Sequence, residues 1–178
     1  YELTIEKGGA ALSAYPLNAY PRVSIAMALR CQGEYEAATD EYIRYLDAYP
    51  WHVRALIEAS FVAMQAGRLE LAESFLERAA VIMPESANLH NNLGLLRQRQ
   101  GRMEEALEEL RTAAALNPRP KRDASYMVNI GCLLMEMKRY DEAERAFKRA
   151  QSINSAWAYP EDLLEELRKR RYGQGGGQ

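Results

Sequence analysis

A period of 34 residues runs through most of this chain. Prolines, glycines and alanines each recur at this spacing and keep a fixed phase relative to one another. The recurring residues are Pro16, Pro50, Pro84 and Pro118, then Gly33, Gly67 and Gly101, and then Ala38, Ala72 and Ala106. A period of this length indicates stacked copies of one supersecondary unit, because a single copy cannot bury its apolar face alone.

The period lengthens to 37 residues near the C-terminal end, where Ala143 follows Ala106. Lys138 then stands where the next glycine would fall, and Ser155 stands in place of the next proline. We expect the three additional residues in the stretch 118–123, which has the composition of a loop.

Each 34-residue unit is predicted to be a helix, a turn and a second helix. In 19–52, apolar residues recur at spacings of three and four on both sides of Gly33, and Pro50 ends the second run. The predicted divisions are 1–18, the second helix of a partial repeat; 19–52, 53–86, 87–123 and 124–157, four repeats of which the third has the insertion; 158–172, a capping helix; and 173–178, a flexible tail.

The two ends of the chain carry further signals. Tyr1 falls in phase with Tyr35, so the first segment aligns with a second helix, and the chain begins without Met, as a trimmed or processed form would. At the other end, Pro160 suits a first helical turn, and Leu163, Leu164 and Leu167 form an apolar stripe. We therefore expect the last helix to cover the fourth repeat.

The pattern resembles the tetratricopeptide repeat family. The matching residues of the third and fourth repeats are Leu93-Gly94, Ala106, Leu110 and Pro118, then Ile130-Gly131, Leu134, Ala143 and Phe147. The column that the family fills with Trp holds Arg22, Leu56, His90 and Met127, and Arg97 departs from the aromatic column. The resemblance implies an all-α fold, a right-handed superhelical solenoid of helix-turn-helix repeats.

Composition excludes several classes of protein. The 178 residues carry 23 basic and 25 acidic side chains, so the formal charge of −2 is too small for a protein that binds nucleic acid by electrostatics. The chain has no apolar run long enough to span a membrane. Its two cysteines, Cys31 and Cys132, fall in distant repeats and are expected to be separate, buried or half-buried thiols.

No catalytic or cofactor motif is present in the sequence. His52 is expected in a loop between repeats and His90 in a packing position, and neither has Cys or acidic residues at metal-ligand spacing. The basic run 168–171 is interpreted as the charged end of a helix, because acidic residues precede it in the same segment. We expect no catalytic residue, no metal and no cofactor.

In the resembled family, the first helix of each repeat lines a concave surface that binds peptides or proteins. When equivalent positions of the repeats are matched to the family, the resemblance implies a set of partner-binding residues. Apolar residues would form the floor of the concave surface, amide side chains would bind a peptide backbone, and arginines would line the rim. That set is Val23, Met27, Arg30, Arg54, Ile57, Phe61, Met64, Asn88, Asn91, Asn92, Leu95, Arg99, Val128, Asn129, Cys132 and Met135. An exposed apolar stripe of this kind indicates a binding site.

The resemblance also distinguishes members of the family by the kind of ligand that their groove residues suit. Members that clamp a terminal carboxylate use Lys and Arg in columns that hold Val23, Asn92, Ser125 and Asn129 here, which argues against binding of chaperone tails. Members of this size with apolar grooves include secretion chaperones and pilus-assembly pilotins, and the residues do not choose between them. The expected role is a non-catalytic scaffold in the cytoplasm, or alternatively in the periplasm, which binds a protein or peptide segment with an apolar face.

Two alternatives stay open. The groove could be filled by an N-terminal segment of the protein or by a second copy, which would make a homo-oligomer. The repeats could also be a structural or substrate-recruiting segment of a larger multidomain protein.

Overall fold

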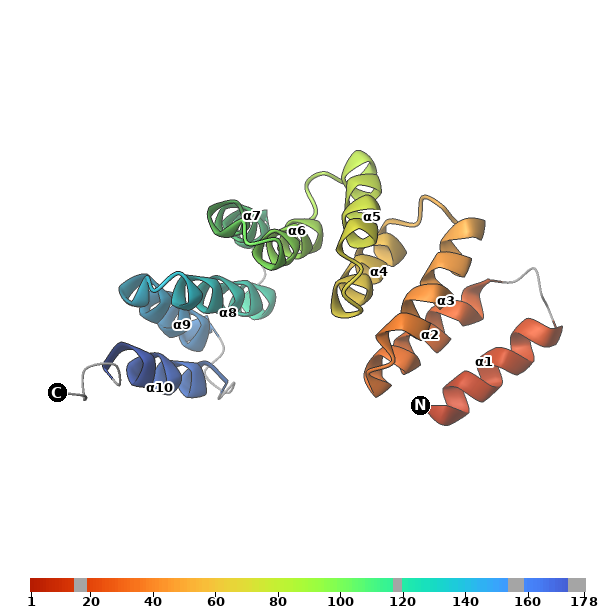
Figure 1. The fold of residues 1–178 in the computed structure, drawn as a ribbon, viewed down its shortest axis with the longest axis horizontal. Helices are drawn as coiled ribbons and strands as arrows, with labels where there is room; N and C mark the ends of the chain where they lie inside the picture. Colours follow the sequence, from red (N-terminus) through yellow and green to blue (C-terminus); the bar gives the residue numbers. More distant parts are fainter. Residues whose placement is uncertain (15–18, 117–119, 154–158, 173–178) are drawn as a thin grey trace. The chain divides into compact units, whose positions relative to one another are not determined.

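The computed structural model describes residues 1–14, 19–116, 120–153 and 159–172, and within these ranges every regular element is an α-helix (Figure 1). Successive helices pair as hairpins, which confirms the predicted all-α class of helix-turn-helix repeats.

The expected tail and two of the periodic prolines lie outside the described residues. They are residues 173–178, Pro16 and Pro118.

The helices fall into two compact units, Tyr1–Pro84 and Glu85–Gln178, and each is described by itself. In the first unit the helices are α1 (Glu2–Ala14), α2 (Tyr20–Gln32), α3 (Tyr35–Ala48), α4 (Val53–Gln65) and α5 (Leu69–Ile82). In the second unit they are α6 (Ala87–Arg99), α7 (Met103–Leu116), α8 (Pro120–Glu136), α9 (Tyr140–Ile153) and α10 (Tyr159–Tyr172). The hairpins are α2–α3, α4–α5, α6–α7 and α8–α9, while α1 packs on α2, and α10 on α9.

The same backbone turn closes the first helix of all four hairpins. Gly33, Gly67 and Gly101 have φ of 82°, 76° and 77°. In the first hairpin, the Gly33 amide donates to the Arg30 carbonyl at 3.1 Å and the next amide donates to the Leu29 carbonyl at 3.0 Å. This pair of bonds satisfies carbonyls at the helix end and needs one residue in the left-handed region. The periodic glycines are therefore explained by the turn.

Lys138 occupies this turn in the fourth repeat, with φ of 60° and the equivalent bond from its amide to the Met135 carbonyl at 3.1 Å. A residue with a Cβ is strained there, so Lys138→Gly is expected to raise the free energy of unfolding by about 1 kcal/mol. Urea denaturation followed by circular dichroism measures the change. Lys148→Gly is the control, since glycine inside α9 should lower stability by about 1 kcal/mol. An unchanged midpoint for Lys138→Gly would show that the turn holds lysine without strain.

The insertion in the third repeat is not a loop where the structure describes it. Helix α8 starts at Pro120 and has 17 residues, whereas α6 has 13. The additional residues extend α8 at its N-terminus, so the prediction of a loop through 118–123 was wrong for the part from Pro120 onward. Proline fits the first turn of a helix because its nitrogen needs no partner there.

Small residues let the two helices of each hairpin approach closely. A Cβ added to Gly94 would lie 2.7 Å from Leu110 Cγ, and Ala106 opposite it is completely buried. Such contacts require the small residue, because the neighbouring helix already fills the space.

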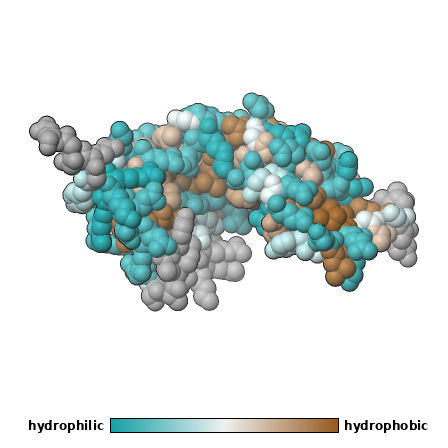
Figure 2. Space-filling view, turned by 60° about the horizontal axis from the view of Figure 1, so that its bottom comes forward, coloured by the Kyte–Doolittle hydropathy of each residue, from teal (hydrophilic) through white to brown (hydrophobic). Residues whose placement is uncertain are grey.

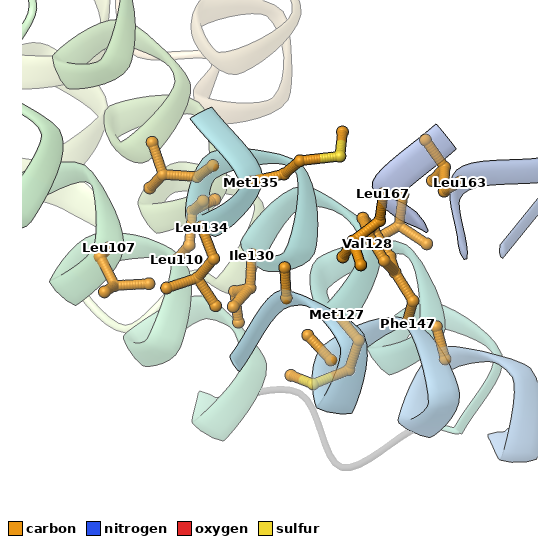
Figure 3. Packing of buried hydrophobic residues seen from close by; sticks show 14 of the residues in the cluster. Leu107, Leu110, Met127, Val128, Ile130, Leu134, Met135, Phe147, Leu163 and Leu167 are labelled. Atoms are coloured by element: carbon orange, nitrogen blue, oxygen red, sulfur yellow. The ribbon is translucent and has the colours of Figure 1, made fainter. Parts of the chain in front are cut away.

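Each unit has its own apolar core. In the first unit the largest fully buried side chains are Tyr42, Tyr45, Leu56 and Leu76. In the second unit, side chains of α7, α8, α9 and α10 form one buried cluster (Figure 3). The cluster includes Leu163, Leu164 and Leu167 of α10, which confirms the apolar stripe predicted for the last helix.

Candidate functional site

The predicted partner-binding residues of the first unit lie on α2 and α4 and differ in exposure. Met27 is 44% exposed, which is high for a methionine, and Met64 is 2% exposed. The remaining residues of this part of the set are half-buried (Val23, Arg30, Ile57 and Phe61) or exposed (Arg54). Met64 is therefore a core residue, and the prediction that it lies on the apolar floor was wrong.

In the second unit the predicted residues lie on α6 and α8. Asn88 and Arg99 are exposed, and Asn91, Leu95, Asn129 and Cys132 are half-buried. Asn92, Val128 and Met135 are buried, at 7%, 4% and 6% exposure.

The burial of Val128 and Met135 has a physical cause. Both belong to the cluster that contains Leu163 and Leu167 of α10 (Figure 3). Side chains of α7, α9 and α10 in this cluster pack with apolar surface of α8 that the column pattern assigned to an open groove. Val128 and Met135 are thus packing residues, as Asn92 is by its burial, and the predicted floor is correspondingly smaller.

The amides expected to grip a peptide backbone are engaged within the second unit. Asn129 Nδ2 donates to Asn91 Oδ1 at 2.7 Å, and Tyr126 Oη donates to Asn88 Oδ1 at 3.0 Å. Gln98 Nε2 donates to an oxygen of the Glu136 carboxylate at 2.8 Å. These bonds join α6 to α8, so the polar groups stabilise the contact between the first helices of consecutive repeats.

The first unit contains a cavity of about 450 Å³ between α2 and α4, with α3 behind it. Its lining residues are Tyr20, Val23, Ser24, Met27, Tyr42, Tyr45, His52, Arg54, Ala55 and Glu58. Three of the predicted residues, Val23, Met27 and Arg54, come together here. In Figure 2, apolar surface forms separate areas, one of them over this unit at the right of the view.

Sequence reasoning missed the residues that α3 and the following loop supply to this cavity. Tyr42, Tyr45 and His52 lie outside the first-helix columns, and Glu58 is in a column not assigned to the groove. Tyr42 and Tyr45 on α3, with Tyr49 directly after the helix, were the available signal.

Aromatic rings form one wall of the cavity. The ring centroids of Tyr20 and Tyr45 are 6.1 Å apart with an interplanar angle of 62°, an edge-to-face arrangement. Tyr45 Oη lies 2.7 Å from His52 Nδ1, and their ring centroids are 5.5 Å apart. Burial, and then the neighbouring Tyr20 and Tyr49, raise the pKa of Tyr45. The hydrogen bond holds His52 against the tyrosine, which is a packing role.

Tyr42 lines the cavity and carries a buried hydroxyl. The residue is completely buried, and its hydroxyl makes no hydrogen bond with any residue that the structure describes. Burial, and then the Glu58 carboxylate, raise the pKa of Tyr42 to about 12, so it keeps its proton at neutral pH. A buried hydroxyl without a partner costs about 1–3 kcal/mol.

The groups considered for metal binding or catalysis have packing roles. His90 Nδ1 lies 2.6 Å from an oxygen of the Glu109 carboxylate, as expected for a packed histidine. Among the described residues, no three His, Cys, Asp or Glu side chains form a group that could hold a metal ion.

The two cysteines have different surroundings. Cys132 is half-buried as expected, and burial, followed by Glu136, raises the pKa of its thiol to about 11, which disfavours the reactive thiolate. Cys31 is exposed, so the prediction that it is buried or half-buried was wrong. It stands at the end of α2, where the helix surface faces solvent.

Three residues of the basic run in α10, Lys169, Arg170 and Arg171, form ion pairs. Lys169 pairs with Glu165 at 2.7 Å within α10, and Arg171 pairs with Asp141 of α9 at 2.8 Å. These contacts fit the predicted helix end with its complementary charges. In the described part of the chain, no helix is both long and apolar enough to traverse a membrane.

Comparisons with known proteins identify similar chains. Two models of the tetratricopeptide repeat family match, one over residues 23–90 and one over residues 85–156. Tetratricopeptide repeat protein 36 of Bos taurus is 34% identical over 106 residues, which are 59% of this chain and 56% of that protein. The chain thus spans little more than half the length of this relative.

A bacterial protein and a solved structure are also similar. The type IV pilus assembly protein PilF of Pseudomonas aeruginosa is 34% identical over 107 residues, which are 60% of this chain and 40% of that protein. The crystal structure of TTC0263, a thermophilic TPR protein of Thermus thermophilus, matches with a TM-score of 0.79 and 20% identity, covering 92% of this chain and 88% of that one. At this identity the likeness concerns the fold.

Proposed function

Because this chain belongs to the tetratricopeptide repeat family, we propose that it is a non-catalytic scaffold that binds an apolar segment of a partner protein. The segment would lie on the first helices of the repeats, either extended or as a helix with one apolar face. The type IV pilus assembly protein among the relatives supports the periplasmic alternative for its location.

The exposure of Met27 beside an open cavity is the observation that carries this proposal. Met27 is 44% exposed, lines the cavity and occupies the same repeat position as half-buried Phe61 on α4. An exposed apolar side chain at the edge of a concave, mostly apolar surface favours a binding site. Methionine suits this role because its flexible thioether adapts to different apolar partners.

The proposed contact set is the accessible part of the predicted one. In the first unit the floor is Val23, Met27, Ile57 and Phe61, and the rim is Arg30 and Arg54. In the second unit the accessible residues are Asn88, Asn91, Leu95, Arg99, Asn129 and Cys132.

Partner capture tests the proposal. Partners are first captured from the native source with the unaltered protein and identified, and their affinities are then measured with purified Met27→Glu, Phe61→Glu and Ala37→Glu variants. Met27→Glu and Phe61→Glu are expected to weaken binding about tenfold or more, because they place a charge in the apolar contact. Ala37→Glu adds the same charge at an exposed position of α3 and is the matched control, expected to bind normally.

Other outcomes would reject the assignment. Equal affinity of Met27→Glu, Phe61→Glu and the unaltered protein, with unchanged helix content, would move binding away from the first helices. Sedimentation velocity distinguishes self-association, because a dimer that Met27→Glu dissociates would make a second copy the occupant.

A further inference from the structure

We propose that the cavity between α2 and α4 is an anchor pocket for a tyrosine side chain of the partner segment. This inference rests on the proposed function and adds to it the chemistry of one residue of the partner. It is carried by two independent observations, the ring-lined shape of the cavity and an unsatisfied hydroxyl at its wall.

The size and walls of the cavity fit an aromatic body. Its volume of about 450 Å³ lies in the range of sites that hold small ligands and large side chains. Tyr20, Tyr45 and His52 supply rings, and Met27 supplies a thioether. An inserted ring can pack edge-to-face on these neighbours, and sulfur also contacts aromatic edges favourably.

The polar groups of the cavity indicate a hydroxyl at the tip of that ring. The Tyr42 hydroxyl has no partner among the described residues and can donate a hydrogen bond, and the Glu58 carboxylate at the same cavity can accept one. A phenol hydroxyl can accept from Tyr42 and donate to Glu58 at the same time. Phenylalanine would leave the Tyr42 hydroxyl without this hydrogen bond.

Met27 provides a direct reporter for the test. The Met27 side chain is exposed and lines the cavity, whereas Met103 and Met137 belong to the second unit. The protein, labelled with ¹³C in the methionine methyl groups, is titrated with N-acetyl-tyrosinamide and separately with N-acetyl-phenylalaninamide. The Met27 resonance is expected to shift saturably with both probes, while Met103 and Met137 stay in place.

The tyrosine probe is expected to bind about fivefold more tightly than the phenylalanine probe, the factor that corresponds to one net hydrogen bond. In Tyr42→Phe this preference is expected to fall but not to disappear, because the donor is removed while the ring and the Glu58 acceptor remain. Glu58→Gln, which removes the charge but keeps the size, is expected to reduce the preference as well. Tyr42→Phe should keep or raise the melting temperature, since it deletes a buried hydroxyl that has no partner among the described residues.

Several results would overturn the inference. They are an unshifted Met27 resonance, equal affinities of the two probes for the unaltered protein, and a preference that is undiminished in both Tyr42→Phe and Glu58→Gln. Partner binding that depends on Met27 and Phe61, combined with probes that show no tyrosine preference, would retain the scaffold and reject the tyrosine pocket. Partner affinity that is unchanged in both Met27→Glu and Phe61→Glu would reject the scaffold proposal itself.

Discussion

Phe147→Ala is expected to lower the free energy of unfolding of the second unit by about 3–5 kcal/mol, the usual cost of truncating a buried aromatic residue. Phe147 is completely buried in the cluster of α7, α8, α9 and α10 (Figure 3). The substitution removes the transfer free energy of the ring and leaves a cavity that its neighbours fill only in part. Domains of ordinary size are stable by about 5–15 kcal/mol, so the loss is a large fraction of the total.

The measurement uses the whole chain. Urea denaturation followed by circular dichroism gives the stability change, and hydrogen exchange of backbone amides locates it. Faster exchange is expected in α8 and α9, with α2–α5 unchanged. Tyr172→Ala is the matched control, because Tyr172 is an aromatic residue that is 67% exposed, and its truncation should change stability by less than about 0.5 kcal/mol. A loss below about 1 kcal/mol for Phe147→Ala would contradict the burial of this ring.

Gly131→Ala is expected to destabilise the same joint by adding atoms. A Cβ at position 131 would lie 2.4 Å from Phe147 Cε1 and 2.6 Å from Cδ1, closer than such atoms approach in proteins. Overpacking of this kind costs about 1–3 kcal/mol, because the surrounding core cannot move aside. In an unconstrained helix the same substitution would stabilise by up to about 1 kcal/mol, so the sign of the effect tests the contact.

Two further variants separate this contact from general effects. Gly9→Ala is the control, since a Cβ at Gly9 meets nothing within 4 Å, and it should stabilise α1. Phe147→Leu removes the ring edge, and in that background Gly131→Ala should cost less than half as much as in the unaltered protein. Equal costs in both backgrounds would mean that the clash is not with the Phe147 ring.

Most of the fold could be predicted because its information is local and repeated. The turn that returns the chain after each first helix needs a left-handed residue, and glycine marks that position at a fixed interval. The small size of Ala106 and Gly94 was enough to predict that the paired helices approach each other closely. The insertion was misplaced because its residues have the composition of a loop, whereas Pro120 begins a helix in the folded chain.

The candidate site was predictable only in outline. Columns of the repeat place Val23 and Met27 on the first helix, and both line the cavity. The same columns placed Val128 and Met135 on an open surface, although both are buried in the cluster of α7, α8, α9 and α10. The amide of Asn129 was expected to face a peptide but is bonded to Asn91 of the preceding repeat.

The sequence by itself determined the pairing of helices into hairpins and the positions of the turns, because period, glycine placement and apolar spacing act within one 34-residue unit. The tertiary structure decided which apolar positions stay accessible, because exposure depends on what a distant segment such as α10 covers. It also decided that Tyr42 and Glu58, from two different helices, line one cavity, with the Tyr42 hydroxyl unpaired among the described residues. Burial and hydrogen bonding between separate helices arise only when the chain has folded, and the proposed specificity of this scaffold depends on them.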